Sequence, residues 1–486
     1  MKKLKLLLVL PNYRWVGGDA STLWQIVPYN LCLLAAMVRD LCEVSILDAY
    51  MADMTPEAVR RELAARAPDV VGVTVMMDQF APSGHAVAAM AREVLPGATV
   101  LMGGVYMTVN PEIAIADANI DYGFVGEGEY VLRDFVRHLT QGEPLPEKGL
   151  VYRRDGQVVN GGRSDFIMDL SELPLPAYDL IDYPAYANSA DRHSVDSPRL
   201  FPYGRIFSSR GCPVNCVFCQ VKSIQGSRFR PRAAEDVLDE IAWLKETYGI
   251  RSLTFDDDNF FTSRRRAKAI LEGMIERGLD MPWVSIATAV FRLDEEMIRL
   301  MRRSGCQYIC IAIESGTDRV VHDIVGKPID FEHAKRITRA AQREGIFVSA
   351  NFIIGFPTET WQEIRDSIRF AEELDPDYMK LFHAIPLRNT RLWELCEEHG
   401  LFKKGFSQGE LRWSAGQIET AEFMANDLTV LRAYEWDRIN FGRPEKLERI
   451  ARQMRISVEE LNDIRRKTRA NAHRQIASQV VREAGQ

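Results

Sequence analysis

The chain has 486 residues, of which 46% are hydrophobic and 27% are charged, so its composition is that of a soluble globular protein. At roughly 100–200 residues per domain, two to four domains are expected, and a disordered, collagen-like or disulfide-scaffold protein is excluded. The net charge of −7 gives no basic field for nucleic acid. Because no segment approaches the ~18 consecutive apolar residues of a membrane span, we expect a cytoplasmic protein.

Residues 1–142 alternate strand-like and helix-like patterns. The predicted strands are 4–10, 44–48, 70–76, 99–103 and 122–125, and the predicted helices are 23–39, 56–66, 84–95 and 129–139. Continuous apolar strands between amphipathic helices indicate a parallel sheet that is covered on both faces. We therefore predict a doubly wound, Rossmann-like α/β domain that binds its ligand at the carboxyl ends of the strands.

Residues 143–204 interrupt this alternation. The dipeptide Asp155-Gly156 is typical of a hairpin turn, and a proline-rich passage over 173–178 follows it. We predict a linker that contains a hairpin and wraps around its neighbours.

The alternation resumes over residues 205–385. The predicted strands are 206–209, 252–255, 284–288, 309–313, 347–354 and 379–383. Six βα units are too few for a closed eight-stranded barrel, so we predict a partial (β/α)6 barrel with its chemistry at the carboxyl ends of the strands. Residues 386–486 are predicted to be helical and highly charged, either as a solvated tail or as a patch for an anionic partner.

Three of the eight cysteines lie in one short loop after the first strand of the second domain. Cys212, Cys216 and Cys219 have the spacing C-x3-C-x2-C. Three thiolates in such a loop can surround an inorganic cluster of four irons and leave one iron open for a small molecule. A structural zinc ion is the alternative, but it needs a fourth ligand, and the nearest histidines are the distant His193 and His322.

This loop, with Phe218 before the last cysteine, resembles the signature of the radical S-adenosylmethionine (radical SAM) superfamily. The resemblance implies that the three cysteines hold a 4Fe-4S cluster whose open iron chelates the methionine moiety of SAM. It also implies an electron donor, such as a flavodoxin or a ferredoxin, and cleavage of SAM to a 5′-deoxyadenosyl radical.

Three later motifs, each after a predicted strand, are similar to the SAM-binding elements of that superfamily. The residues that the resemblance assigns to SAM are Phe218, Asp257, Asp258, Glu314, Ser315 and Gly355. Carboxylates that face the ammonium group of SAM would form charge-assisted hydrogen bonds. The alternatives are a solvated acidic turn over 256–258 and a Thr-capped turn between strand and helix after Gly355.

A doubly wound domain ahead of a radical SAM core resembles the cobalamin-binding branch of the superfamily. The residues assigned to cobalamin on this basis are Pro11, Asn12, Thr74, Val75, Met76, Gly103, Gly104, Tyr106, Gly126, Glu127 and Gly128. The glycines would allow close approach of a bulky ligand, or would serve only as turns. The Asp-x-His-x-x-Gly motif that supplies a histidine ligand is missing, so we expect base-off cobalamin without a protein histidine on the cobalt.

The resemblance favours a radical SAM C-methyltransferase. One SAM would methylate cobalamin, a second would give the radical that abstracts a substrate hydrogen, and methylcobalamin would methylate the resulting carbon of a small-molecule, lipid or natural-product substrate. The alternatives are an oxidative cyclase or hydroxylase, including one that acts on tetrapyrroles, an N-terminal domain that only docks a partner, and a non-enzymatic Fe–S redox protein. Among the remaining histidines, His383 at the end of the last strand is the better site candidate.

Overall fold

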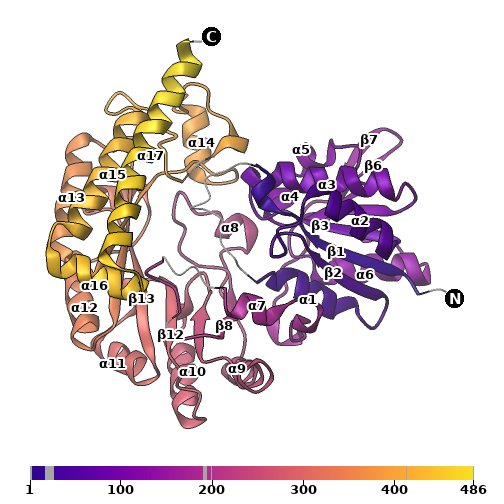
Figure 1. The fold of residues 1–486 in the computed structure, drawn as a ribbon, viewed down its shortest axis with the longest axis horizontal. Helices are drawn as coiled ribbons and strands as arrows, with labels where there is room; N and C mark the ends of the chain where they lie inside the picture. The colour runs from indigo at the N-terminus through magenta and orange to yellow at the C-terminus, as the bar shows by residue number, and fades with distance from the viewer. Residues whose placement is uncertain (1–2, 17–26, 190–193, 199, 412, 485–486) are drawn as a thin grey trace. The chain divides into compact units, whose positions relative to one another are not determined.

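The computed structural model describes residues 3–16, 27–189, 194–198, 200–411 and 413–484. The chain divides into two compact units (Figure 1). The first unit comprises residues 1–189 together with 223–226 and 407–411, and the second unit comprises the rest. Across the described ranges, no helix has both the length and the apolar character that crossing a membrane requires.

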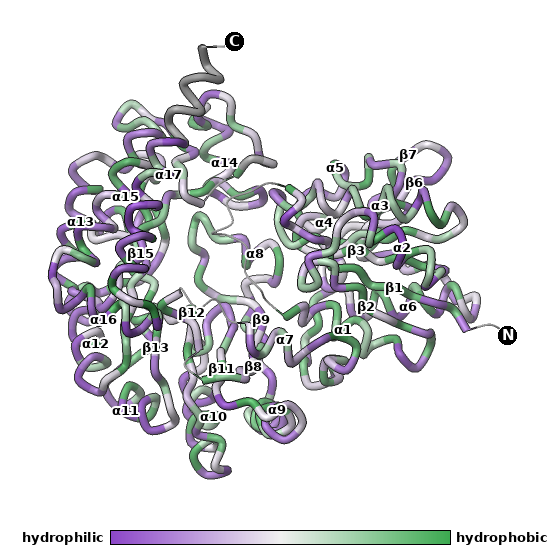
Figure 2. The backbone as a smooth tube through the Cα atoms, in the orientation of Figure 1, coloured by the Kyte–Doolittle hydropathy of each residue, from purple (hydrophilic) through white to green (hydrophobic). Residues whose placement is uncertain are grey.

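The first unit is built on a seven-stranded sheet with the order β2-β1-β3-β4-β5-β6-β7. Its strands are β1 (Lys5–Leu10), β2 (Glu43–Asp48), β3 (Val70–Thr74), β4 (Thr99–Gly103), β5 (Tyr122–Phe124), β6 (Leu150–Arg154) and β7 (Gln157–Asn160). The first five are parallel, and hydrophobic residues run along β1 and β3 (Figure 2). The order 2-1-3-4-5 confirms the doubly wound prediction and puts the topological switch point between β1 and β3, where such sheets bind ligands.

Helices cover both faces of this sheet. They are α1 (Tyr29–Val38), α2 (Pro56–Arg66), α3 (Ala81–Val94), α4 (Val105–Val109), α5 (Pro111–Ile115), α6 (Glu129–Gln141) and the outlying α7 (Tyr183–Ala187). α1 packs with α6, and α2 packs with α3. The first helix begins later than the predicted residue 23, because Pro28 sits at its cap and a proline inside the helix would break it. Residues 23–26 of that prediction lie outside the described residues.

The expected hairpin is present and extends the sheet of the first unit. Asp155 and Gly156 both have positive φ, 52° and 78°, as a tight hairpin turn requires. β6 pairs antiparallel with both β5 and β7. The sheet therefore continues past residue 142, where we placed the domain boundary. The proline-rich passage is also held to this unit, because the Ala177 amide donates to the Cys32 carbonyl of α1 at 3.0 Å.

The second unit contains six parallel strands in sequential order, which confirms the partial barrel. The strands are β8 (Tyr203–Ile206), β11 (Ser252–Phe255), β12 (Trp283–Thr288), β13 (Cys306–Glu314), β14 (Phe347–Ile354) and β15 (Tyr378–His383). The helices between them are α9 (Ala234–Tyr248), α10 (Arg264–Glu276), α11 (Glu295–Arg303), α12 (Phe331–Arg343) and α13 (Trp361–Leu374). The first strand, predicted over 206–209, is instead Tyr203–Ile206, and Ser209–Arg210 form a separate short strand, β9, that pairs with β10 (Arg230–Pro231).

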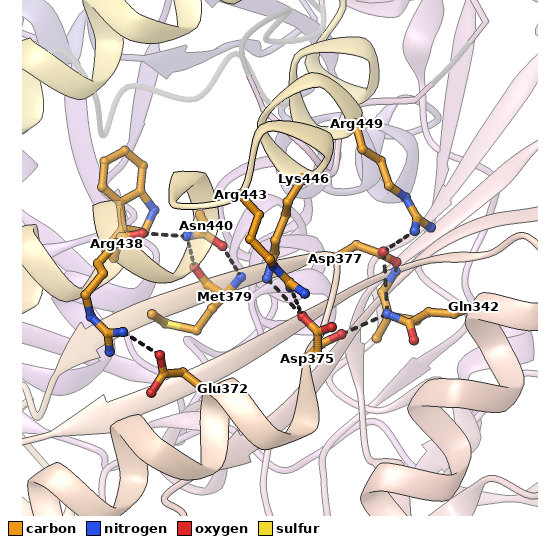
Figure 3. A network of polar contacts seen from close by, with 12 residues as sticks. Gln342, Glu372, Asp375, Asp377, Met379, Arg438, Asn440, Arg443, Lys446 and Arg449 are labelled. Atoms are coloured by element: carbon orange, nitrogen blue, oxygen red, sulfur yellow. Dashed lines mark hydrogen bonds and ion pairs between the residues drawn. The ribbon is translucent and has the colours of Figure 1, made fainter.

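The C-terminal region is helical, as predicted. Its helices are α14 (Arg391–Glu398), α15 (Ala425–Phe441), α16 (Pro444–Met454) and α17 (Val458–Ala484). α15 covers β15, the edge strand of the barrel. The Asn440 amide accepts from the Met379 N–H at 2.7 Å and donates to the Met379 carbonyl at 2.8 Å, as a neighbouring strand would (Figure 3). Arg432 Nε donates to the Leu381 carbonyl at 2.7 Å. The open edge of the sheet is thereby satisfied by side chains.

Apolar packing fills the barrel near the amino ends of its strands. Tyr308 and Cys310 of β13 and Phe347 of β14 are buried against Phe441 and Met454 of the C-terminal helices. The buried polar side chains of this unit that bear on a functional site, such as Asp257 and Glu314, lie instead at the carboxyl ends of the strands.

Candidate functional site

The loop that carries the three cysteines is braced from several sides. It begins directly after β9, which is paired with β10. At its centre, the Val217 N–H donates to the Val325 carbonyl at 3.1 Å, and the Val217 carbonyl accepts from the Leu392 N–H at 2.9 Å. All three cysteines are free thiols of intermediate burial. The fold thus holds the loop while leaving its sulfur atoms available.

The local environment of these thiols fits a bound metal cluster. Burial raises the pKa of Cys216 to about 12 and that of Cys219 to about 11, and the Val221 backbone amide partly opposes the effect at Cys219. For Cys212, burial also raises the pKa, against hydrogen bonds from the Val214 amide and the Asn259 side chain. Desolvated thiolates need compensating positive charge, which iron supplies.

The cysteine loop supplies three ligands and lacks the fourth that a structural zinc ion needs. Within the part of the chain that the structure describes, no group of three or more His, Cys, Asp or Glu side chains, the three cysteines included, is drawn together around a metal position. Three thiols on one braced loop, without a fourth ligand, fit the open cluster better.

The acidic turn after β11 directs its three carboxylates to different places. Asp256 is buried and pairs with Arg205 at 2.5 Å. Asp257 accepts hydrogen bonds from the hydroxyls of Ser208, at 2.7 Å, and Ser209. Asp257 is 3% exposed, and it therefore holds the start of the cluster loop.

Asp258 is the carboxylate that remains beside the cluster loop. Its carboxylate accepts from the Gly211 N–H at 3.0 Å, next to the first cysteine. Burial raises the pKa of Asp258 to about 6, although the Gly211 hydrogen bond opposes this. The next residue, Asn259, contacts the Cys212 thiol and was not singled out from the sequence, where the run of three aspartates before it is the stronger signal.

Glu314 ends β13 in an unusual conformation. Its φ is +72°, a region that residues other than glycine seldom adopt. One carboxylate oxygen accepts from Lys327 Nζ at 2.5 Å, and the same ammonium donates to the Ala312 carbonyl at 3.1 Å. Burial lowers the pKa of Lys327, but the charges of Glu314 and Cys216 outweigh this, so that the pKa lies above its ordinary value. Sequence reasoning missed Lys327, because it stands in a loop without periodicity or motif.

Ser315 plays a different part from Glu314. It is fully buried, and its hydroxyl is within 2.9 Å of the Ser367 hydroxyl of α13. Ser367 also accepts from the Gly316 N–H at 3.0 Å. Ser315 therefore anchors the turn to the helix layer, while Glu314 is buried and pairs with Lys327.

The turn after β14 lies next to the aromatic residue of the cluster loop. Gly355 has a φ of +87°, and its N–H donates to Glu359 at 2.7 Å. Phe356 stands 6.0 Å from Phe218 between ring centroids. Thr360 caps α13, so the predicted Thr cap exists alongside the glycine turn. The structure thus brings the predicted SAM residues to the carboxyl ends of neighbouring strands, with Asp257 and Ser315 in supporting positions.

In the first unit, the residues predicted for cobalamin end or follow β1, β3, β4 and β5, at the carboxyl edge of the sheet. Several of them are engaged in the fold. Pro11 is buried, and Met76 follows Val75 just beyond β3. Asn12 donates to Asp53 at 3.0 Å.

Other residues predicted for cobalamin accept hydrogen bonds from neighbouring parts of the first unit. Val75 accepts from the Tyr106 N–H at 3.2 Å. Glu127 accepts from the Ile167 N–H at 2.7 Å, and Thr74 accepts from the Asn30 amide at 3.2 Å. These residues therefore form hydrogen bonds that hold the carboxyl edge of the sheet together.

The glycines divide into those that the fold needs and those that it does not. A Cβ on Gly104 would lie 2.4 Å from the Val75 carbonyl oxygen, and one on Gly126 would lie 2.5 Å from the Ser164 hydroxyl. Both also have positive φ, 97° and 98°. At Gly103 a Cβ would meet only Phe124, at 3.7 Å, and at Gly128 the nearest atom is 3.5 Å away. Gly103 and Gly128 are therefore unexplained by the fold and fit close approach of a ligand.

The imidazole of His85 is fully engaged. One ring nitrogen is 2.7 Å from Asp117 and the other is 3.2 Å from the Tyr106 hydroxyl. The other described histidine of this unit, His138, is in the last turn of α6, and the helix begins at the ligand-binding edge of the sheet and runs away from it. Neither is placed to coordinate a metal at the carboxyl edge.

His383, the histidine that we favoured as a site candidate, faces away from the barrel interior. Side chains alternate along a strand, and Lys380 of the same strand pairs with Asp196 at 2.7 Å and lies over the ring of the core residue Tyr308. His383 is on the opposite face, 3% exposed, next to the Leu428 backbone of α15. Burial lowers its pKa to about 3, so it is a neutral core residue.

Comparison with known proteins agrees with this arrangement. A family profile described as the radical SAM superfamily matches residues 206–371, and one described as the B12 binding domain matches residues 20–136. An uncharacterized methyltransferase of Pyrococcus horikoshii is 33% identical over 408 residues, which are 82% of this chain and 85% of that protein. The cytidylyl-2-hydroxyethylphosphonate methyltransferase of Streptomyces wedmorensis is 29% identical over 70% of both chains.

Solved structures share the fold. TsrM of Kitasatospora setae, a radical S-adenosylmethionine methyltransferase with cobalamin and a 4Fe-4S cluster bound, matches with a TM-score of 0.66 at 22% identity, over 82% of this chain and 78% of that one. The cobalamin-dependent S-adenosylmethionine radical enzyme OxsB matches with a TM-score of 0.70 at 17% identity, over 96% and 72%.

Proposed function

Because the chain belongs to the cobalamin-binding branch of the radical SAM superfamily, we propose that it is a C-methyltransferase that adds a methyl group to an unactivated carbon of a small-molecule substrate. Its cofactors are a 4Fe-4S cluster, SAM and cobalamin. When bound, these supply the electron that cleaves SAM, the 5′-deoxyadenosyl radical and the carrier of the methyl group.

The residues of the second unit would bind and orient the cluster and SAM. Cys212, Cys216 and Cys219 would ligate the cluster, and Asp258 would accept hydrogen bonds from the SAM ammonium group. Glu314, held in its strained conformation, would accept from the hydroxyl groups of SAM.

Aromatic and glycine residues would complete the SAM site. Phe218 and the turn at Gly355 would border the adenine, with Phe356 closing that side against water. Asp257 and Ser315 would keep the binding elements in place. An electron donor of the flavodoxin or ferredoxin type would reduce the cluster.

The observation that carries methyl transfer, as opposed to other radical chemistry, is the engagement of His85. With both ring nitrogens bonded, His85 cannot coordinate cobalt, and no Asp-x-His-x-x-Gly motif supplies another histidine. Cobalamin would then bind base-off and without a protein histidine, and when bound it would supply the carrier of the methyl group. The open space at Gly103 supports close approach of this cofactor to the sheet.

A second candidate function is oxidative cyclisation. The anaerobic magnesium-protoporphyrin IX monomethyl ester cyclase of Rubrivivax gelatinosus is 26% identical over 77% of this chain and 66% of that one. A cyclase would use the same SAM-cleaving site without methylating its substrate, so the products derived from SAM separate the two functions.

The test is anaerobic incubation of the reconstituted protein with SAM, a reductant and a metabolite extract, with and without cobalamin. Methyl transfer predicts S-adenosylhomocysteine as well as 5′-deoxyadenosine, and the former only when cobalamin is bound. Formation of 5′-deoxyadenosine alone, at the same rate with and without cobalamin, would contradict the proposal and favour cyclisation. Cys212→Ala is the control that should not form 5′-deoxyadenosine, because it removes a ligand of the cluster that supplies the electron for SAM cleavage.

A further inference from the structure

A buried lysine lies beside the cluster loop, outside every motif that the sequence suggested. Lys327 follows a π-helix over Arg319–Ile324, a conformation that is often found at functional sites. Its side chain is buried, and the residue is 7% exposed. The backbone N–H of Lys327 donates to the Val321 carbonyl at 2.9 Å, so the loop folds back onto the π-helix.

The ammonium of Lys327 makes two hydrogen bonds within the fold. It donates to Glu314 at 2.5 Å and to the Ala312 carbonyl at 3.1 Å. A lysine ammonium has three donors, so a third N–H remains after these two bonds. The side chain thus fixes the Glu314 carboxylate through one oxygen, while the other oxygen is left to accept from a ligand.

The same loop is joined to the cysteine loop. Val325 accepts from the Val217 N–H at 3.1 Å, and a Cβ on Gly326 would lie 3.4 Å from the Asn215 carbonyl oxygen. The charge of Lys327 acts on the Cys212, Cys216 and Cys219 thiols. This ammonium is therefore a buried positive charge placed near both the thiols and the Glu314 carboxylate.

We propose that Lys327 is a positioning residue with two effects: it holds Glu314 in the conformation that binds SAM, and its charge raises the reduction potential of the cluster. The second effect follows because a nearby cation stabilises the reduced, more negative cluster. The inference rests on the cluster and SAM as cofactors, but not on the methyl transfer proposed above.

Lys327 and Glu314 carry opposite charges, so their single variants should shift the reduction potential of the cluster in opposite directions. In the reconstituted protein without SAM, Lys327→Met should lower the reduction potential of the cluster, and Glu314→Gln should raise it. The double variant removes a neutral pair and should lie close to the wild-type potential. A role in packing alone would shift both single variants in the same direction or in neither.

The affinity for SAM gives an independent readout. Because Lys327 acts through Glu314, Lys327→Met should weaken SAM binding by about 10-fold or more, which is the effect of one misplaced charge-assisted hydrogen bond. Adding Lys327→Met to Glu314→Gln should then cost much less than it does alone. Lys327→Arg, which keeps the charge, should restore the potential even where it does not restore affinity.

The controls separate this role from loss of folding. Lys335→Met removes a lysine that pairs with Glu332 and Glu373 on the helices outside the sheet, and it should change neither the potential nor SAM affinity. Iron content and the unfolding transition identify any variant that fails to fold, and Lys327→Arg then carries the test. An unchanged potential in both single variants, or additive losses of SAM affinity, would overturn the proposal. Failure to form a methylated product would leave it intact.

Discussion

The acidic turn after β11 offers a matched pair of variants at adjacent positions. Asp258 accepts a hydrogen bond from the Gly211 N–H at 3.0 Å and stands beside the cluster loop. Asp257 accepts from Ser208 and Ser209 and is buried. Asp258→Asn should therefore impair SAM binding, whereas Asp257→Asn should impair folding.

The magnitudes follow from these contacts. Replacing Asp258 by Asn removes a charge-assisted hydrogen bond to the SAM ammonium group, worth ~1.5–3 kcal/mol, which is roughly a 10- to 150-fold loss of affinity. Replacing Asp257 by Asn sets an amide N–H₂ group against hydroxyls that donate to the carboxylate. Leaving buried groups poorly paired costs about 1–3 kcal/mol of unfolding free energy.

The assay is equilibrium binding of SAM per cluster-loaded chain, with iron content and denaturant unfolding measured on the same samples. Asp258→Asn should bind SAM weakly with normal iron content and normal stability. Asp257→Asn should unfold at lower denaturant concentration and bind SAM nearly as the wild type does once loaded. If Asp257→Asn weakened SAM binding more than Asp258→Asn did, the assignment of the two carboxylates would be refuted.

Three further outcomes are expected. Gly103→Val should block cobalamin uptake without lowering stability, because only Phe124 lies near its Cβ; normal uptake would contradict the placement of cobalamin at this edge. Asn440→Ala should lower the free energy of unfolding by about 2–4 kcal/mol, because it removes two buried hydrogen bonds and one partly buried one. A change below about 1 kcal/mol by denaturant unfolding would show that the edge of β15 does not need these side-chain bonds. His383→Gln should retain formation of 5′-deoxyadenosine and lose less stability on acidification. The His383 pKa is about 3 in the folded chain against 6.5 normally, so stability is lost as pH falls from 6.5 towards 3, as unfolding at pH 7 and pH 5 would measure.

Most of the fold could be predicted from local patterns. Helix α2 and strands β4, β11 and β14 have the predicted bounds, because their apolar periodicity and flanking turns are contained in the segments themselves. The addition of β6 to the edge of the first sheet could not be predicted in this way. A hairpin is a local signal, but its pairing with β5 depends on contacts between distant parts of the chain.

The candidate site was predictable in outline and not in detail. The spacing of the cysteines and the order of motifs after strands predict that the loop and Glu314 lie at the carboxyl ends of the barrel strands, because the carboxyl ends of parallel strands share one edge. Which of Asp257 and Asp258 contacts the backbone next to Cys212 depends on backbone torsion in a three-residue turn. Lys327 contacts Glu314 because the chain returns to β13 after the π-helix, which local patterns do not predict. His383 was not recognised as a core residue because a shift of one residue along a strand moves a side chain to the opposite face of the sheet.

The central claim is tested most directly by following the methyl group. The protein, reconstituted with cluster and cobalamin and supplied with SAM labelled in its methyl group, is incubated anaerobically with a metabolite extract, and the extract is examined by mass spectrometry. The account predicts a metabolite that gains the label on carbon, together with equal amounts of S-adenosylhomocysteine and 5′-deoxyadenosine. Sustained formation of 5′-deoxyadenosine with an altered but unlabelled metabolite would contradict it.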